Sequence, residues 1–315
     1  MEDKIKEETL RQILRVVPVS IRGALENALR YADDVQEIVL RCGQPVCLYT
    51  RRGLLFLTSN GCLSSNCDSQ PLLNVNPQTI SECFNAVCGY SVYSHINEIK
   101  EGFVTINGGH RVGISGTAVV SSGEIINIRD ISAVSIRISR EIIGCGKYVH
   151  SIISASSSGV LICGIPCSGK TTVLRDLARI LSFEDRSRVS LVDTRGEIAA
   201  VYRCEPQMDV GFCDVLNGYP RLEGITQAVK VFAPEYIICD EIGCEEDFTA
   251  IRNGVNSGAR FVTTAHASSW TELVSKQHIK DILSIGAFEK VVFLSGRETP
   301  GVVREIADVR EKLYG

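Results

Sequence analysis

A stretch near the middle of the chain has the residue types and the spacing of a phosphate-binding loop. Residues 164–172 read G-x-x-x-x-G-K-T-T and follow a short apolar run at 159–163. Glycines permit backbone conformations that a side chain would forbid, so successive N–H groups can turn toward an anion. A lysine then supplies a point charge for the outer phosphates, and a hydroxyl supplies a ligand for Mg²⁺. The pattern predicts a nucleotide-phosphate site.

Within this loop Lys170 is expected to meet the outer phosphates, and Thr171 is expected to bind Mg²⁺ through its hydroxyl. The amphipathic segment at 173–181 predicts a helix whose N-terminus faces the phosphates. The residues predicted to bind nucleotide are Gly164, Pro166, Cys167, Ser168, Gly169, Lys170, Thr171 and Thr172.

Carboxylates that would complete the chemistry follow two other apolar runs. Asp240 comes after the run at 236–239 and has the position of an acid that holds Mg²⁺ opposite Thr171. Glu241 is placed to orient and deprotonate the attacking water. Asp193 and Glu197 close a neighbouring run and predict a second acidic cluster, with acids in the first turn of a helix as the alternative.

A histidine and an arginine complete the predicted site. His266 ends an apolar run and is expected to sense the γ-phosphate or to contact Glu241. An arginine finger accelerates hydrolysis by roughly 10³ to 10⁵, and in the chain no arginine lies immediately beside Asp240 and Glu241. The first domain, or a neighbouring subunit, is therefore the expected source. The candidates are Arg111, Arg129 and Arg137, for which solvated strand faces are the alternative.

Strands alternating with helices after the loop predict an α/β domain with a parallel sheet covered on both faces. Ligands of such sheets bind outside the carboxyl ends of the strands, where the polar residues fall. The preceding part predicts a smaller α+β domain, with helices at 5–17 and from a Ser20 cap, and strands at 125–128 and 132–138 among others. Because residues 141–147 carry two glycines, we expect domains at 1–147 and 148–315.

Composition counts against several other classes of protein. With 315 residues, 44% hydrophobic residues and a net charge of −4, the chain is long enough for two folded domains and has no broad basic footprint for nucleic acid. No apolar run approaches the roughly 20 residues that cross a bilayer, and the first residues are not a signal peptide. We expect a cytoplasmic protein whose contact with any membrane is peripheral.

The 13 cysteines are scattered, and the sequence contains no C-x-x-C pair. A cytoplasmic chain keeps its thiols reduced, so we expect small buried hydrophobes or incidental thiols. A zinc site that uses Cys62 and Cys67 is the open alternative.

The order of these motifs resembles the secretion and pilus-motor ATPases of type II and type IV systems. Further stretches look like the stage III sporulation protein AA family within that superfamily, and together they span nearly the whole chain. These stretches are the residues at 37–45, 101–105 and 108–114, and Asp240-Glu241-Ile242-Gly243 with Glu246-Asp247.

The resemblance implies a RecA-like ATPase that binds ATP and Mg²⁺ and works as a homo-oligomer, as a hexameric ring. It implies a place on the mother-cell side of the septal or engulfing membrane of an endospore former. The partners would be membrane proteins of the channel between mother cell and forespore. It also implies that Arg111 and Arg137 approach nucleotide at a domain or subunit boundary.

Two other functions stay open. One is a nucleotide-gated assembly scaffold with slow hydrolysis, because Glu241 is followed by Ile242-Gly243-Cys244 and not by an arginine. The other is an ATP-dependent nucleic-acid-binding protein, against which the lack of a basic appendage counts.

Overall fold

A computed structural model describes residues 2–32, 35–50, 53–66 and 71–315. The chain forms two compact units, Met1–Arg140 and Glu141–Gly315, which we call the N-terminal and the C-terminal unit. The division lies before the boundary expected after Lys147. The physical reason is that the N–H of Gly146 donates to Oδ2 of Asp176 over 2.7 Å, so the glycine-rich segment packs on the C-terminal unit.

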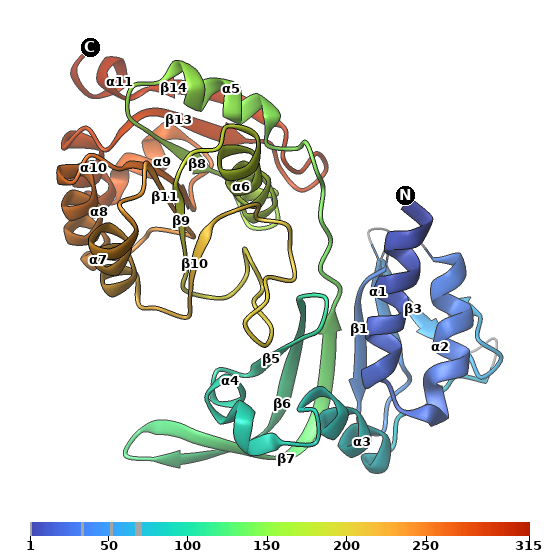
Figure 1. Ribbon diagram of the computed structural model, residues 1–315. Coiled ribbons are helices and arrows are strands. Elements are labelled where there is room, and N and C mark those ends of the chain that lie inside the picture. Colours follow the sequence, from blue (N-terminus) through green and yellow to red (C-terminus); the bar gives the residue numbers. More distant parts are fainter. Residues whose placement is uncertain (1, 33–34, 51–52, 67–70) are drawn as a thin grey trace. The chain divides into compact units, whose positions relative to one another are not determined.

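The described part of the N-terminal unit contains an antiparallel sheet of order β4-β3-β2-β1-β7-β6-β5. Its strands are β1 (Val35–Arg41), β2 (Cys47–Thr50), β3 (Gly53–Leu57), β4 (Leu63–Ser64), β5 (Phe103–Ile106), β6 (His110–Ser121) and β7 (Glu124–Arg137). The distal half of the β6–β7 hairpin extends beyond the other strands (Figure 1).

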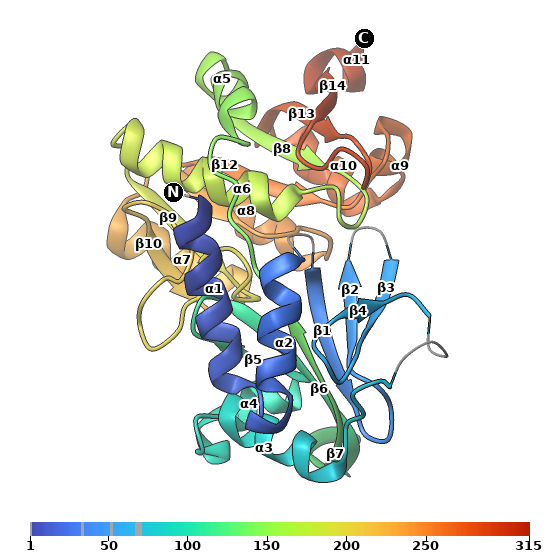
Figure 2. The ribbon, with the colours of Figure 1, turned by 90° about the vertical axis from the view of Figure 1, so that its right-hand side faces the viewer.

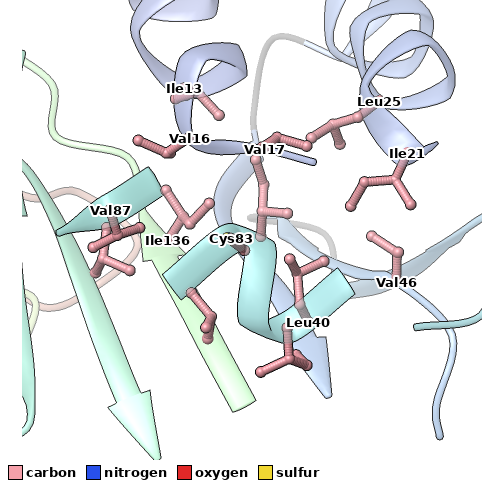
Figure 3. Packing of buried hydrophobic residues seen from close by; sticks show 14 of the residues in the cluster. Ile13, Val16, Val17, Ile21, Leu25, Leu40, Val46, Cys83, Val87 and Ile136 are labelled. Atoms are coloured by element: carbon pink, nitrogen blue, oxygen red, sulfur yellow. The ribbon is translucent and has the colours of Figure 1, made fainter. Parts of the chain in front are cut away.

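Helices cover one face of this sheet. They are α1 (Glu2–Val16), α2 (Val19–Tyr31), α3 (Pro77–Val87) and α4 (Ile96–Lys100), with a 3₁₀ turn, η1, at Val92–His95. Figure 2 shows α1 and α2 side by side. Apolar side chains at helical spacing, such as Ile13 and Val16 of α1, pack with Leu40 of β1 and Ile136 of β7 (Figure 3). Burial of this apolar area stabilises the unit.

Two sequence predictions about local structure in this unit were wrong. Ser20 does not cap a helix, because α2 begins at Val19 after Pro18, whose fixed φ suits the start of a helix. The strands expected at 125–128 and 132–138 are one strand, β7. Asp130 takes a φ of +48° where the register with β6 shifts between Ser115 and Thr117, and this bulge lets the strand continue.

The described part of the C-terminal unit contains a sheet of order β10-β9-β11-β12-β8-β13-β14, parallel except for the edge strand β14. Its strands are β8 (Gly159–Cys163), β9 (Val189–Asp193), β10 (Asp214–Asn217), β11 (Tyr236–Cys239), β12 (Arg260–Ala265), β13 (Phe288–Leu294) and β14 (Val303–Asp308). Strands β8, β9 and β11 are buried along their whole length, as expected for a sheet that is covered on both faces.

Helices lie on both faces of this sheet. They are α5 (Lys147–Ala155), α6 (Lys170–Arg179), α7 (Arg221–Phe232), α8 (Glu246–Asn256), α9 (Trp270–Ser275), α10 (Gln277–Ser284) and α11 (Val309–Tyr314), with a π-helical turn, η2, at Ile180–Glu184. One hydrophobic core lies between the sheet and helices α5 and α6. A second hydrophobic core lies between the sheet and helices α7, α8, α9, α10 and α11. This is the predicted α/β architecture.

Candidate functional site

The strand order brings the sequence motifs to one edge of the C-terminal sheet. Strands β9, β11, β12 and β8 are consecutive neighbours and parallel, so their carboxyl ends meet. Asp193 ends β9, Asp240 and Glu241 follow β11, and His266 follows β12. The phosphate-loop sequence follows β8 and leads into α6, as its spacing predicted. The site lies where open parallel sheets bind ligands.

Close packing inside the loop explains its two glycines. Gly169 has a φ of +90°, and a Cβ there would lie 2.6 Å from the backbone nitrogen of Gly301. That nitrogen donates to the carbonyl of Ser168 over 2.8 Å, so the turn containing Gly301 braces the loop. A Cβ on Gly164 would lie 2.3 Å from the Ser168 hydroxyl. Neither site accommodates a larger residue without movement of the loop.

Lys170 is buried at the start of α6, and its ammonium group points back into the loop. Its Nζ donates to the carbonyls of Gly164 at 2.9 Å and Ile165 at 3.2 Å, and lies 3.1 Å from Nδ1 of His266. Burial lowers the pKa of Lys170, and the negative charge of Glu241 opposes this shift. The ammonium is thus held among acceptors at the place where the sequence predicted a phosphate contact.

His266 joins Lys170 to Glu241. Its Nε2 lies 3.0 Å from Oε1 of Glu241, while Nδ1 faces the Lys170 ammonium, which has only hydrogens to offer. The contacts therefore assign a tautomer in which Nδ1 accepts from Lys170 and Nε2–H donates to Glu241. Of the two roles considered for His266, the structure contains the contact with Glu241.

Asp240 is buried beside a cation. Its Oδ1 lies 3.4 Å from Nη2 of Arg221, at the start of α7. Burial raises the pKa of Asp240 to about 6, and the Arg221 charge opposes this shift. Within the described residues, Oδ2 of Asp240 is buried and has no hydrogen-bond partner. A carboxylate oxygen that still lacks a donor, at the mouth of a phosphate loop, suits a hydrated divalent cation, so the residues present fit Mg²⁺.

The other predicted acidic cluster is held largely by the backbone. Asp193 is fully buried and accepts from the N–H groups of Glu197 at 2.9 Å, Ile198 at 3.0 Å and Ala199 at 2.8 Å. Burial raises the pKa of Asp193, and these three bonds oppose the shift. The carbonyl of Glu197 accepts from Nη2 of Arg175 at 2.7 Å. Asp193 therefore shapes the loop after β9, and the catalytic role of Glu197 stays a prediction.

The chain brings arginines to the site that sequence adjacency does not reveal. Nη1 of Arg195 lies 3.6 Å from Oε2 of Glu241. Nη2 of Arg221 lies 2.6 Å from the carbonyl oxygen of Glu241, and Nε of Arg297 donates to the carbonyl of Pro166 over 3.3 Å. No arginine follows Glu241 directly in the chain, but the fold places Arg195 and Arg221 beside it. That the arginine finger comes from the first domain or a neighbouring subunit stays a prediction. The only sequence signal for Arg221 was an arginine at the first position of a helix after Pro220.

Arg111 and Arg137 belong to the N-terminal unit, on β6 and β7. They are directly opposed Cα partners, so their side chains share a face of the antiparallel sheet. The guanidinium of Arg111 lies 3.5 Å from the ring centroid of Phe103. Arg129, the third candidate, pairs with Asp130 at 3.6 Å. A role for Arg111 and Arg137 at the nucleotide stays a prediction.

The described cysteines are free thiols, and several of them are buried, as expected from the sequence. Cys163 and Cys239 are buried in β8 and β11, and burial raises the pKa of each thiol. Cys62 is exposed, while Cys67 lies outside the described residues. Among the residues that the structure describes, no group of three or more His, Cys, Asp or Glu side chains is placed to hold a metal ion. In the same part of the chain, every helix is too short or too polar to cross a bilayer.

Comparison with solved structures supports the fold. The X-ray structure of the ATPase DotB from Legionella pneumophila has a TM-score of 0.55 and 16% identity, covering 88% of this chain and 76% of DotB. The pilus retraction motor PilT with bound ADP has a TM-score of 0.54 and 13% identity, covering 88% and 78%. At these identities the likeness shows the fold alone, which is the RecA-like P-loop fold.

Sequence comparison supports the family. The chain is 32% identical over 306 residues to stage III sporulation protein AA from Bacillus subtilis (strain 168), covering 95% of each protein. The family profile described as "Sporulation stage III, protein AA" matches residues 7–313. The motifs at the carboxyl ends of β8, β9, β11 and β12 lie within that match. The chain therefore belongs to the stage III sporulation protein AA family.

Proposed function

We propose that this protein is a Mg²⁺-dependent ATPase, and that the hydrogen-bonded residues Lys170, His266 and Glu241 form the centre of its active site. The carrying observation is the 3.0 Å contact between His266 and Glu241 beside a complete phosphate loop. Backbone N–H groups at the start of α6 and the Lys170 ammonium bind the phosphates of ATP. Thr172, in the first turn of α6, belongs to the same nucleotide-binding segment.

Glu241 is the catalytic base in this proposal. Its carboxylate accepts the proton of the attacking water, while His266 keeps the carboxylate turned toward the loop. Thr171 and Asp240 are the residues that would hold Mg²⁺, which when bound offsets the charge of the phosphates. Glu197 is a second acid near the water. Arg111 or Arg137 supplies the arginine finger, from the same chain or from a neighbouring one.

At the level of the cell, we infer a homo-oligomeric motor, built as a hexameric ring, that energises or assembles the channel between mother cell and forespore. Family membership and the fold shared with DotB and PilT support this inference. Its partners are membrane proteins of that channel. The protein is cytoplasmic, on the mother-cell side, and associates peripherally with the septal or engulfing membrane.

Two variants test the enzyme. Lys170→Ala removes the phosphate contact and is expected to abolish ATP binding, whereas Glu241→Gln keeps binding and loses at least about 10² in kcat, the lower range for an acid–base group. Lys147→Ala, at the start of α5, is the matched control and should behave as wild type. Turnover by Glu241→Gln at the wild-type rate would refute the assignment. Sedimentation of Glu241→Gln with and without ATP tests assembly.

One observation favours a second candidate function, a nucleotide-gated scaffold with slow hydrolysis. The Glu241 carboxylate is engaged by His266 on one oxygen and by Arg195 on the other. A carboxylate whose two oxygens already contact other side chains has fewer acceptor positions left for an attacking water. If Glu241→Gln binds ATP, assembles and fully supports sporulation, the scaffold is the better description, and hydrolysis is incidental.

A further inference from the structure

Arg221, the first residue of α7, contacts several of the residues that follow β11, although it belongs to no motif found in the sequence. Its Nη2 lies 2.6 Å from the carbonyl oxygen of Glu241 and 3.4 Å from Oδ1 of Asp240. Its Nη1 forms an ion pair with Oδ1 of Asp247, on α8. The Arg221 side chain is 14% exposed, and that of Asp247 is 1% exposed. One planar guanidinium thus joins α7 to the end of β11 and to the start of α8.

Asp247 closes the other side of this arrangement. Its Oδ2 accepts from the N–H of Gly243 at 2.7 Å and from the N–H of Cys244 at 2.9 Å. Burial opposes ionisation of Asp247, but these two bonds and the Arg221 charge outweigh it and lower its pKa. The charged pair therefore encloses the whole turn that begins at Glu241. We call Arg221 and Asp247 together the clamp.

The backbone at Glu241 is fixed on three sides. The carbonyl before it, of Asp240, accepts from the Thr263 hydroxyl at 3.1 Å. The N–H after it, of Ile242, donates to the carbonyl of Thr264 at 2.8 Å. The carbonyl of Glu241 itself is held by Arg221. Only rotation of the Glu241 side chain remains free, and His266 and Arg195 limit that rotation.

Arg221 also makes the two carboxylate oxygens of Asp240 inequivalent. Oδ1 faces the guanidinium, whereas the buried Oδ2 has no hydrogen-bond partner among the described residues. A partner on one oxygen fixes the plane of the carboxylate, so the other oxygen keeps a defined direction. A lysine could not do this equally well, since it supplies a point charge and not a planar fork.

We propose that Arg221 is a positioning residue of the ATPase: it aims the Glu241 carboxylate through the Glu241 carbonyl, and it aims Oδ2 of Asp240 toward the site of the divalent cation. This inference rests on the proposed function. It predicts that the clamp affects both kcat and the Mg²⁺ concentration needed for turnover. A residue needed only for folding would change neither quantity in the folded protein.

The test compares Arg221→Gln and Arg221→Lys with Arg260→Gln in the full-length protein. Arg260 is also a half-buried arginine, which contacts the carbonyls of Ile153 at 2.6 Å and Ser156 at 2.7 Å. It lies at the amino end of β12, away from the carboxyl ends that carry the site. Its removal therefore reports the effect of losing a packed arginine without touching Asp240 or Glu241.

Four quantities are measured for each folded variant: kcat, KM for ATP, the free Mg²⁺ concentration that gives half-maximal turnover, and the melting temperature. Arg221→Gln is expected to lose about 10- to 100-fold in kcat and to need more Mg²⁺ by a similar factor, the range typical of outer-shell partners. KM for ATP should stay within about threefold, because the loop and Lys170 are untouched. Arg221→Lys should recover part of the loss.

The outcomes separate this inference from the proposed function. If Arg221→Gln melts lower, as Arg260→Gln does, but keeps wild-type kcat and magnesium dependence, the clamp is structural and the inference is wrong. If Arg221→Gln does not fold, Arg221→Lys and Asp247→Asn decide by the same measurements. If the wild-type protein neither binds nor hydrolyses ATP, the proposed function fails, and the positioning role is refuted with it.

Discussion

The Nε2 atom of His266 lies 3.0 Å from Oε1 of Glu241, across the carboxyl ends of the adjacent strands β12 and β11. Because Nδ1 of the same ring faces the Lys170 ammonium at 3.1 Å, the imidazole donates to Glu241 through Nε2. One imidazole ring thus relates the phosphate-binding lysine to the expected base, although the three residues are far apart in the sequence.

Replacing His266 with alanine is expected to lower kcat by about 10- to 100-fold, since Glu241 loses the donor that orients it. The Kd for ATP should change little, because the loop carbonyls still hold Lys170. Single-turnover hydrolysis and equilibrium binding of a fluorescent ATP analogue separate the two effects. His150→Gln is the control, because His150 on α5 hydrogen-bonds to Asp185, away from the loop. An equal loss of binding would instead make His266 a phosphate contact.

Gly169→Ala should disable the loop. A residue with a side chain at a φ of +90° is strained, and its Cβ would meet the backbone of Gly301 at 2.6 Å. We expect a loss of about 2 kcal/mol or more in the free energy of unfolding, with ATP binding abolished in calorimetry. Gly23→Ala is the opposite case: it lies within α2, nothing lies within 4 Å of the added Cβ, and the helix should gain about 1 kcal/mol. Wild-type ATP affinity in Gly169→Ala would contradict the close packing.

Arg111→Ala and Arg137→Ala test the predicted finger. Arg111 and Arg137 repel one another, but Arg111 also packs on Phe103 and Arg137 lies opposite Glu37, so removing either should change the melting temperature only slightly. If either supplies the finger, kcat nevertheless falls by about 10³-fold or more, with ATP binding retained. Arg11→Ala, which removes an exposed pair with Glu7 on α1, is the control. Wild-type turnover in both variants would show that neither residue is the finger, and Arg195 and Arg297 would then be the next candidates.

The buried His110 predicts that the N-terminal unit weakens in acid. Burial lowers its pKa to about 4, its Nε2 lies 3.2 Å from Oε1 of Gln12, and its Nδ1 accepts from the N–H of Ser139 at 3.2 Å. An unfolded histidine has a pKa of about 6.5, so between these values the unfolded chain binds more protons than the folded chain. Its contribution to stability is complete above pH 6.5 and is lost as the pH falls toward 4.

Between pH 7 and pH 5 the loss should amount to about 2 kcal/mol. Hydrogen exchange of peptides from β5 and β6, followed by mass spectrometry, measures it for this unit alone. His110→Gln should flatten the dependence on pH, whatever it does to stability at pH 7. An unchanged slope in His110→Gln would show that another group is responsible.

Local patterns predicted much of the fold and most of the residues at the site. The apolar run before Gly164 and the amphipathic segment after it became β8 and α6, because burial on both faces and helical periodicity are written in consecutive residues. The β7 strand was divided in the prediction, since a bulge at Asp130 depends on pairing with β6. Strand β10 and the edge strand β14 also depend on neighbours that lie elsewhere in the chain.

The phosphate loop, the acids and histidine that follow buried strands, and the resemblance to the sporulation family can all be recognised in the amino-acid sequence. Which side chains meet depends on the fold: His266 with Glu241, Arg195 with Glu241, and Arg221 with Asp240 and Asp247. The reason is physical. The spacing of apolar residues along the chain decides whether a segment is a helix or a strand. Pairing between charged side chains depends instead on the order of the strands in the sheet and on where helices such as α7 pack against it.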